Sequence, residues 1–291
     1  MQTFIQLVFT GIQISAIYVL FSLGLTLIFG VMKIVNFAHG QFFTLTALLI
    51  SVALPYLLGY GLSTLAAYML AVLVSLCASL VLGLIIYQGG LRFFQRDLSG
   101  SFILTVGVVL FLEGVFLHYF GGVVRSVPPF IEGSITLLGV NITLQRILLI
   151  LVSLSFTAVL FWVLSFTKLG KAMRAVSIDH EAAMLQGIPY KKIALHGFVI
   201  ATFMGALAGA IMAPLAMISP TVGSDYLVKG FIAVIIGGLG SVPGAIVGSL
   251  FIGMIESFGG YFFDPSLANI AIFVLVIFTL LVRPNGLLKN G

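Results

Sequence analysis

Charge is the property that this sequence has least of. Its 291 residues include 13 Lys and Arg and 8 Asp and Glu, so 7% of the chain is charged and 61% is hydrophobic. Because about a quarter of the residues in a water-soluble domain are charged, this composition excludes a soluble globular fold. The mean hydropathy is +1.27, and apolar stretches of about 20 residues, each long enough to cross a bilayer, recur along the sequence. We therefore expect an all-α polytopic membrane protein.

Cysteine and the common catalytic motifs are scarce as well. Cys77 is the only cysteine, so no disulfide can form within the chain. The sequence has no Gly-x4-Gly-Lys-Ser/Thr loop for nucleotide phosphates. The four histidines, His39, His118, His180 and His196, are far apart and lack the spacing of metal ligands. We therefore expect no enzyme activity, no metal and no cofactor on this chain itself.

What the sequence does have is a series of apolar segments that together form one membrane domain, residues 1–291. We expect about eight full spans and one broken or re-entrant element, because the seventh segment is too short for a comfortable crossing. We expect the first segment to be a retained span rather than a signal peptide. The predicted segments are 4–30, 41–58, 62–87, 101–120, 144–166, 193–217, 226–237, 244–262 and 267–282.

Basic residues mark the loops that we expect to face the cytoplasm, because lysine and arginine resist translocation. The same tendency explains the net charge of +5 without a nucleic acid partner. The loop 121–143 then lies in the periplasm, and so does the amino terminus unless a re-entrant turn at 33–40 reverses it. The basic loops contain Arg92 and Arg96, the segment 168–192, and the tail residues Arg283 and Lys289.

The segment 168–192 is predicted to dock a partner in the cytoplasm. It holds five of the 13 basic residues. Ser177 is expected to cap a short helix with Asp179 and Glu181 in its first turn, where the helix dipole favours negative charge. A plain loop resting on anionic headgroups would need the basic residues but not the capped helix with exposed Ala and Met. The predicted coupling residues are Asp179, Glu181, Ala182, Ala183, Met184, Gly187 and Ile188.

Two glycine-rich breaks interrupt the apolar sequence, at 35–40 and 237–244. Non-helical backbone inside a bilayer is tolerated where protein or a water-filled cavity covers it, and transporters often place such breaks at their binding site. We predict that both breaks line a translocation path, although ordinary capped turns would also explain them. The predicted path residues are Asn36, His39, Gly40, Gln41, Gly237, Gly238, Gly240, Ser241 and Pro243.

Four further charged residues lie within or beside the apolar segments. Glu113 and Glu256 are functional candidates, because a charge at bilayer depth is costly, but a polar neighbour on another helix would also account for either. Asp225 and Lys229 are four positions apart, and we expect them to form a solvent-side pair on one helix face.

Four motifs are similar to a known family of transporters. Glu181-Ala182-Ala183-x3-Gly187 resembles the Glu-Ala-Ala-x3-Gly loop of ABC importer permeases. The segment 24–40, which ends in Asn36-Phe37-Ala38-His39-Gly40, resembles the opening of branched-chain amino acid permeases of the LivH type. The segments 237–245 and 283–287 are similar to later parts of the same family, so the resemblance covers essentially the whole chain. Two departures are Gln41, where the resemblance implies an acidic residue, and a docking loop that matches only the core of the importer consensus.

The resemblance implies an ABC importer permease fold in a bacterial inner membrane. It implies a permease subunit that carries branched-chain or aliphatic amino acids by alternating access. Its partners would be a second related permease, two cytoplasmic ATPases that bind ATP and Mg²⁺, and a periplasmic solute-binding protein. An importer of urea or short amides is the nearest alternative, and a stand-alone secondary transporter or channel is a more distant one.

Overall fold

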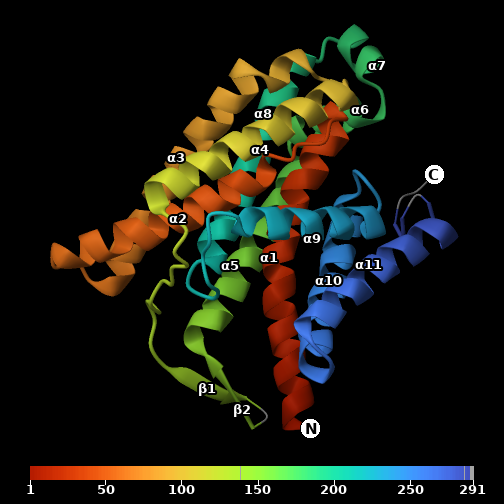
Figure 1. Ribbon diagram of the computed structural model, residues 1–291. Coiled ribbons are helices and arrows are strands. Elements are labelled where there is room, and N and C mark those ends of the chain that lie inside the picture. Colours follow the sequence, from red (N-terminus) through yellow and green to blue (C-terminus); the bar gives the residue numbers. More distant parts are fainter. Residues whose placement is uncertain (138, 285, 289–291) are drawn as a thin grey trace.

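The computed structural model describes residues 1–137, 139–284 and 286–288, and these residues are almost entirely helical. They form eleven α-helices, one short 3-10 helix and one β-hairpin (Figure 1). In chain order the elements are α1 (Gln2–Met32), α2 (His39–Gly59), α3 (Thr64–Gly89), η1 (Leu91–Phe93), α4 (Leu98–Phe120), β1 (Ser134–Leu137), β2 (Val140–Thr143), α5 (Leu144–Phe166), α6 (Lys168–Ile178), α7 (His180–Leu185), α8 (Tyr190–Met212), α9 (Val222–Gly237), α10 (Val242–Phe262) and α11 (Pro265–Val282).

Eight of the described helices are long and apolar enough to cross a membrane, namely α1 to α5, α8, α10 and α11. The remaining apolar helix, α9, has 16 residues and is the short element that the sequence predicts. The predicted count of eight spans and one broken element is therefore confirmed. Helix α8 ends at Met212 rather than at 217 because Pro214 lacks the N–H that the next helical turn requires.

Helix α1 occupies the centre of the bundle, where it packs against α5, α8, α9 and α10 (Figure 1). Of its most apolar stretch 89% is buried, against 22% for α4, α5 and α11, which lie at the periphery. Small residues allow α1 and α10 to approach closely: Gly253 lies against Ser15, and the Ser22 and Ser249 hydroxyls are 2.8 Å apart. Close contact of this kind is the main source of helix association in lipid, where tails are as apolar as leucine side chains.

The two ends of the molecule differ in structure (Figure 1). Helices α6 and α7 form one end, and the amino terminus and the β1–β2 hairpin form the other. The hairpin, with Ser134 paired to Thr143 and Leu137 to Val140, is an addition to the all-helical prediction. It forms because Val140 and Ile142 are buried and alternate with exposed Asn141 and Thr143, the period of a strand.

The chain breaks after α1 so that α2 begins inside the bundle. Lys33 ends α1 in the left-handed conformation with φ 54°, and the non-helical segment 33–38 leads to His39. The first turn of α2 then meets the first turn of α9, where Gly40 and Gly223 touch backbone to backbone. The Gly223 N–H donates to Thr44 Oγ1 at 2.9 Å, so one free N–H at the start of α9 is satisfied by α2.

The Glu256 carboxylate of α10 connects to α9 by an ion pair and to α1 by a hydrogen bond. Lys229 Nζ lies 2.6 Å from Glu256 Oε1, and the Tyr18 hydroxyl donates to Glu256 Oε2 at 2.5 Å. The predicted pair of Asp225 with Lys229 is wrong, because the lysine extends to α10 and Asp225 is exposed. Glu256 therefore has a structural role in this fold.

Replacing Gly223 by alanine should destabilise the protein, because the added methyl group would overlap the backbone carbonyl oxygen of Gly40. Overpacking costs about 1–3 kcal/mol, so we expect a clear fall in the melting temperature of the purified protein in mild detergent. Gly107→Ala on α4 is the matched control, since its Cβ would meet nothing within 4 Å. Equal melting temperatures for the two variants would contradict the α2–α9 contact.

Lys229→Met should also destabilise the fold, because it leaves the Glu256 carboxylate without its cation. The two side chains remain 21% and 27% exposed. Allowing for solvent screening, we expect a loss of about 1–3 kcal/mol in chemical unfolding. The double variant Lys229→Met/Glu256→Met removes both charges and should be more stable than Lys229→Met alone. Strictly additive losses would mean that the pair does not interact.

Candidate functional site

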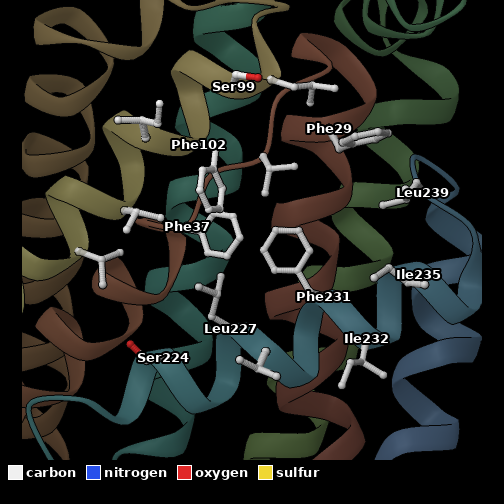
Figure 2. Close-up of a pocket in the computed structure, with 16 residues that line it drawn as sticks. Phe29, Phe37, Ser99, Phe102, Ser224, Leu227, Phe231, Ile232, Ile235 and Leu239 are labelled. Atoms are coloured by element: carbon white, nitrogen blue, oxygen red, sulfur yellow. The ribbon is translucent and has the colours of Figure 1, made fainter. Parts of the chain in front are cut away.

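One cavity of the described residues has a volume of about 1080 Å³ and is almost wholly apolar. It lies between the end of α1, the segment 33–38, α4 and α9. Fourteen of its 16 lining residues are apolar, and the two serines, Ser99 and Ser224, stand at opposite ends (Figure 2). Between them the Phe37 ring lies 5.1 Å from that of Phe102 on α4 and 5.4 Å from that of Phe231 on α9. Such a wall suits an aliphatic group.

The polar residues predicted at the first break lie behind this wall. Asn36, His39 and Gln41 are at most 1% exposed, and none of them lines the cavity. Their neighbours Val35 and Phe37 line it instead. The side chains behind the wall help to fix the break.

Two contacts show how this break is held. The Asn36 side-chain oxygen accepts a hydrogen bond from the Ala38 N–H at 3.1 Å, which closes the turn into α2. The His39 ring packs against Gly24 of α1 and Gly205 of α8, where a Cβ would meet the ring at 2.6 and 2.8 Å respectively. A role for these residues in the path stays a prediction.

A carboxylate marks one end of the cavity. Glu113 of α4 accepts a hydrogen bond from Ser224 Oγ at 2.6 Å and a longer one from Gln41 Nε2 at 3.4 Å. Gln41 and Ser224 belong to the first turns of α2 and α9, whose dipoles both favour a negative charge there. Gln41, where the family resemblance implies an acidic residue, thus donates to a carboxylate from α4.

The second break is a tight turn, and its Leu239 lines the same cavity. Gly237 and Gly244 touch backbone to backbone, and Gly238 and Gly240 have φ values of 107° and 86°, which favour glycine. Ser241 caps α10 by accepting from the Gly244 N–H at 3.1 Å.

The end of the chain covers this turn. The Leu287 and Leu288 N–H groups donate to the carbonyl oxygens of Ile236 and Gly237 at 2.8 and 3.1 Å. Position 285 of the segment 283–287 and the tail residue Lys289 lie outside the described residues.

Both breaks reach the first cavity, through Val35 and Phe37 of the first and Leu239 of the second, but none of the predicted path residues themselves lines it. The start of α2 faces the start of α9, whereas the segment 240–243, which includes Pro243, lines a second cavity of about 450 Å³ with α1, α5 and α6. The residue that meets Gly40, Gly223, was missed. The signal for it was the Gly223-Ser224 pair just before an apolar segment, a pattern typical of a helix start.

The segment that is predicted to dock a partner forms helices α6 and α7, and the structure corrects the residue that caps the short helix. Asp179, not Ser177, caps the short helix: its Oδ1 accepts from the N–H groups of Glu181 and Ala182 at 2.9 and 3.1 Å. Ser177 belongs to the last turn of α6, because the chain stays helical through Ile178 before the cap.

The surface of α7 is mostly available for contact. Glu181, Ala182, Met184 and Leu185 are exposed, whereas Ala183 is buried and holds α7 on the bundle. The helix ends where Ile188 N donates to Ala183 O at 3.0 Å and Gly187 adopts φ 80°. Among residues 1–137, 139–284 and 286–288, no group of three or more His, Cys, Asp or Glu could hold a metal ion.

Known proteins resemble this chain over nearly its whole length. Residues 7–281 match the family described as the permease component of branched-chain amino acid transport systems. BraD of Pseudomonas aeruginosa, a high-affinity branched-chain amino acid transport system permease protein, is 28% identical over 296 residues, which cover 98% of this chain and 95% of BraD. LivH of Escherichia coli, with the same description, is 26% identical over 303 residues, which cover 98% of this chain and 95% of LivH.

More distant relatives carry other solutes. The xylose/arabinose import permease XylH of Sulfolobus acidocaldarius is 28% identical over 243 residues, which cover 77% of this chain and 64% of XylH. No solved structure matches the chain. The polytopic helical fold and the match over nearly its whole length show that this chain belongs to the family of permease components of branched-chain amino acid transport systems.

Proposed function

We propose that the chain is the membrane-spanning subunit of an ATP-driven ABC importer that carries branched-chain and other aliphatic amino acids across the bacterial inner membrane by alternating access. The observation that carries this proposal is the apolar cavity between α4, α9 and the segment 33–38, in a chain of this family. A cavity with apolar walls and polar groups only at its ends suits a solute with an aliphatic side chain and a charged head.

The distribution of basic residues gives the orientation. Arg96 lies over the Tyr190 ring, 5.8 Å from its centroid, and the Tyr87 hydroxyl is 3.5 Å from the Lys191 carbonyl oxygen, so the loop after α3 and the start of α8 share one end of the molecule. By the positive-inside rule this end, with α6 and α7, faces the cytoplasm. The amino terminus and the loop 121–143 then face the periplasm, where a solute-binding protein would dock.

Helices α6 and α7 would receive the ATPases. The exposed part of α7 offers a carboxylate at Glu181 and apolar side chains at Met184 and Leu185, and the full predicted contact set is Asp179, Glu181, Ala182, Ala183, Met184, Gly187 and Ile188. Two cytoplasmic ATPases would bind the ATP and Mg²⁺, a second homologous permease would complete the membrane core, and this chain would hold no cofactor and catalyse no reaction.

A mechanical connection leads from this contact to the bundle. The Arg174 guanidinium donates to the carbonyl oxygens of Leu164 and Ser165 at 2.6 and 3.3 Å, which ties α6 to the end of α5. Helix α6 also packs against α1 and α8. A push on α7 would therefore tilt the central helices, and movement of α1 relative to α4 and α9 would change the cavity between them.

The substrate class is tested by uptake. The transporter is reconstituted in proteoliposomes from the purified permease, its partner permease, the ATPases and the binding protein. It should import radiolabelled leucine when ATP is supplied on the side of the membrane that carries the ATPases. Valine and isoleucine should compete, and urea, acetamide and xylose should not. Uptake of labelled urea or acetamide, with no uptake of leucine, would favour the short-amide alternative. Uptake by this chain without ATPases would favour a secondary transporter.

Glu181→Lys should weaken ATPase binding and abolish coupled transport without unfolding the protein, because the residue is exposed and outside the spans. Co-purification of the ATPases in mild detergent measures the binding, and the melting temperature measures the fold. Glu132→Lys makes the same charge change at an exposed site outside the docking helices and should retain the ATPases. Full ATPase recovery with Glu181→Lys would show that α7 is not the docking element.

A further inference from the structure

The two carboxylates within the spans have different surroundings. Glu256 is paired with Lys229, and the Lys229–Glu256 contact is the one ion pair found among the described residues. No cation pairs with Glu113 in that part of the chain, although it lies inside α4. An unpaired charge at this depth is costly and calls for a partner.

The neutral donors around Glu113 leave part of its carboxylate free. Both of its hydrogen bonds, from Ser224 Oγ and Gln41 Nε2, end on Oε1, and no described residue donates to Oε2. The side chain is half-buried, so the free oxygen remains within reach of a small solute. The two helix starts explain why an anion is tolerated there, but they do not supply a cationic partner for Oε2.

Glu113 is not itself among the residues that line the apolar cavity, but two of its neighbours are. Ser224, the donor to Glu113, lines the cavity, and so does Val109, which precedes Glu113 by one helical turn. In Figure 2 Ser224 stands at one end and the rings of Phe37, Phe102 and Phe231 lie farther in. The carboxylate therefore adjoins one end of an otherwise apolar space that has no cation of its own among its lining residues.

We propose that Glu113 binds the ammonium group of the transported amino acid while the aliphatic side chain occupies the apolar part of the cavity. The proposal rests on the proposed function and gives this permease a selectivity of its own. A neutral amide or sugar would leave the carboxylate unpaired. A solute with an ammonium group would compensate it by a charge-assisted hydrogen bond.

The test separates charge from structure. In the complete transporter, Glu113→Gln keeps the size of the side chain and an acceptor for Ser224 but removes the charge. With saturating loaded binding protein, leucine uptake should fall about tenfold or more, the effect of one lost charge-assisted bond. ATP hydrolysis and the melting temperature should stay near those of the wild type, and Glu113→Asp should retain part of the uptake. Unchanged uptake by Glu113→Gln would overturn the proposal.

Chemical rescue gives a second readout. Because Cys77 is the single cysteine of this chain, a Cys77→Ser background makes Glu113→Cys its only thiol, and the partner subunits are used in cysteine-free form. A methanethiosulfonate reagent that attaches a sulfonate should restore uptake, and reagents that attach a trimethylammonium or a neutral methyl group should not. Equal rescue by all three reagents, or by none while Glu113→Gln is also poorly folded, would assign Glu113 a structural role and overturn the proposal.

Glu256→Gln is the matched control, because it makes the same change at the carboxylate paired with Lys229. It should lower the melting temperature, and the selectivity of its uptake for solutes with an ammonium group should stay that of the wild type.

Failure of the wild-type transporter to carry any aliphatic amino acid would reject the proposed function. Normal leucine uptake by both the wild type and Glu113→Gln would reject only the role of Glu113.

Discussion

The contact between the first turns of α2 and α9 is the constraint on which the rest of this structure depends. Both helices begin inside the bundle, where the N–H groups of a first helical turn have no water to bond. The chain meets this requirement from within: Thr44 Oγ1 accepts from Gly223 N, and Asn36 closes the turn before α2. Gly40 and Gly223 allow the two backbones to touch, and the cavity lies beside their junction.

The same junction explains where the polar groups are found. Two helix starts side by side attract an anion, and α4 provides Glu113, while its apolar residues form one wall of the cavity. Helix α4 has few neighbours in the bundle, chiefly α2 and η1, so its separation from α9 leaves the space open. The ion pair of Lys229 with Glu256 does not line the cavity and holds α9 to α10.

Hydropathy was enough to predict the spans and the short α9, and capping and helix propensity were enough to predict a short helix in the segment 168–192, because each of these is a local property of about 10 to 20 residues. Contacts between distant segments were not predictable in that way. Glycine content marked breaks at 35–40 and 237–244 but could not reveal that Gly40 meets Gly223. Lys229 had an acid four positions away, and its actual partner is 27 positions away. Asp179 rather than Ser177 is the cap because Ser177 belongs to a separate helix, α6, which was not predicted.

The position of the unpaired carboxylate bears on how one fold serves relatives that import different solutes. A cavity lined by apolar residues discriminates weakly between solutes of similar size, since one methylene group is worth only about 1–3 kcal/mol. A buried group that needs a partner discriminates more strongly, because the wrong solute leaves it unsatisfied. Under the proposed function, Glu113 would make a neutral solute costly to hold, whereas the apolar wall would merely accommodate it. Selection by the binding protein would then be repeated inside the membrane by a single charge.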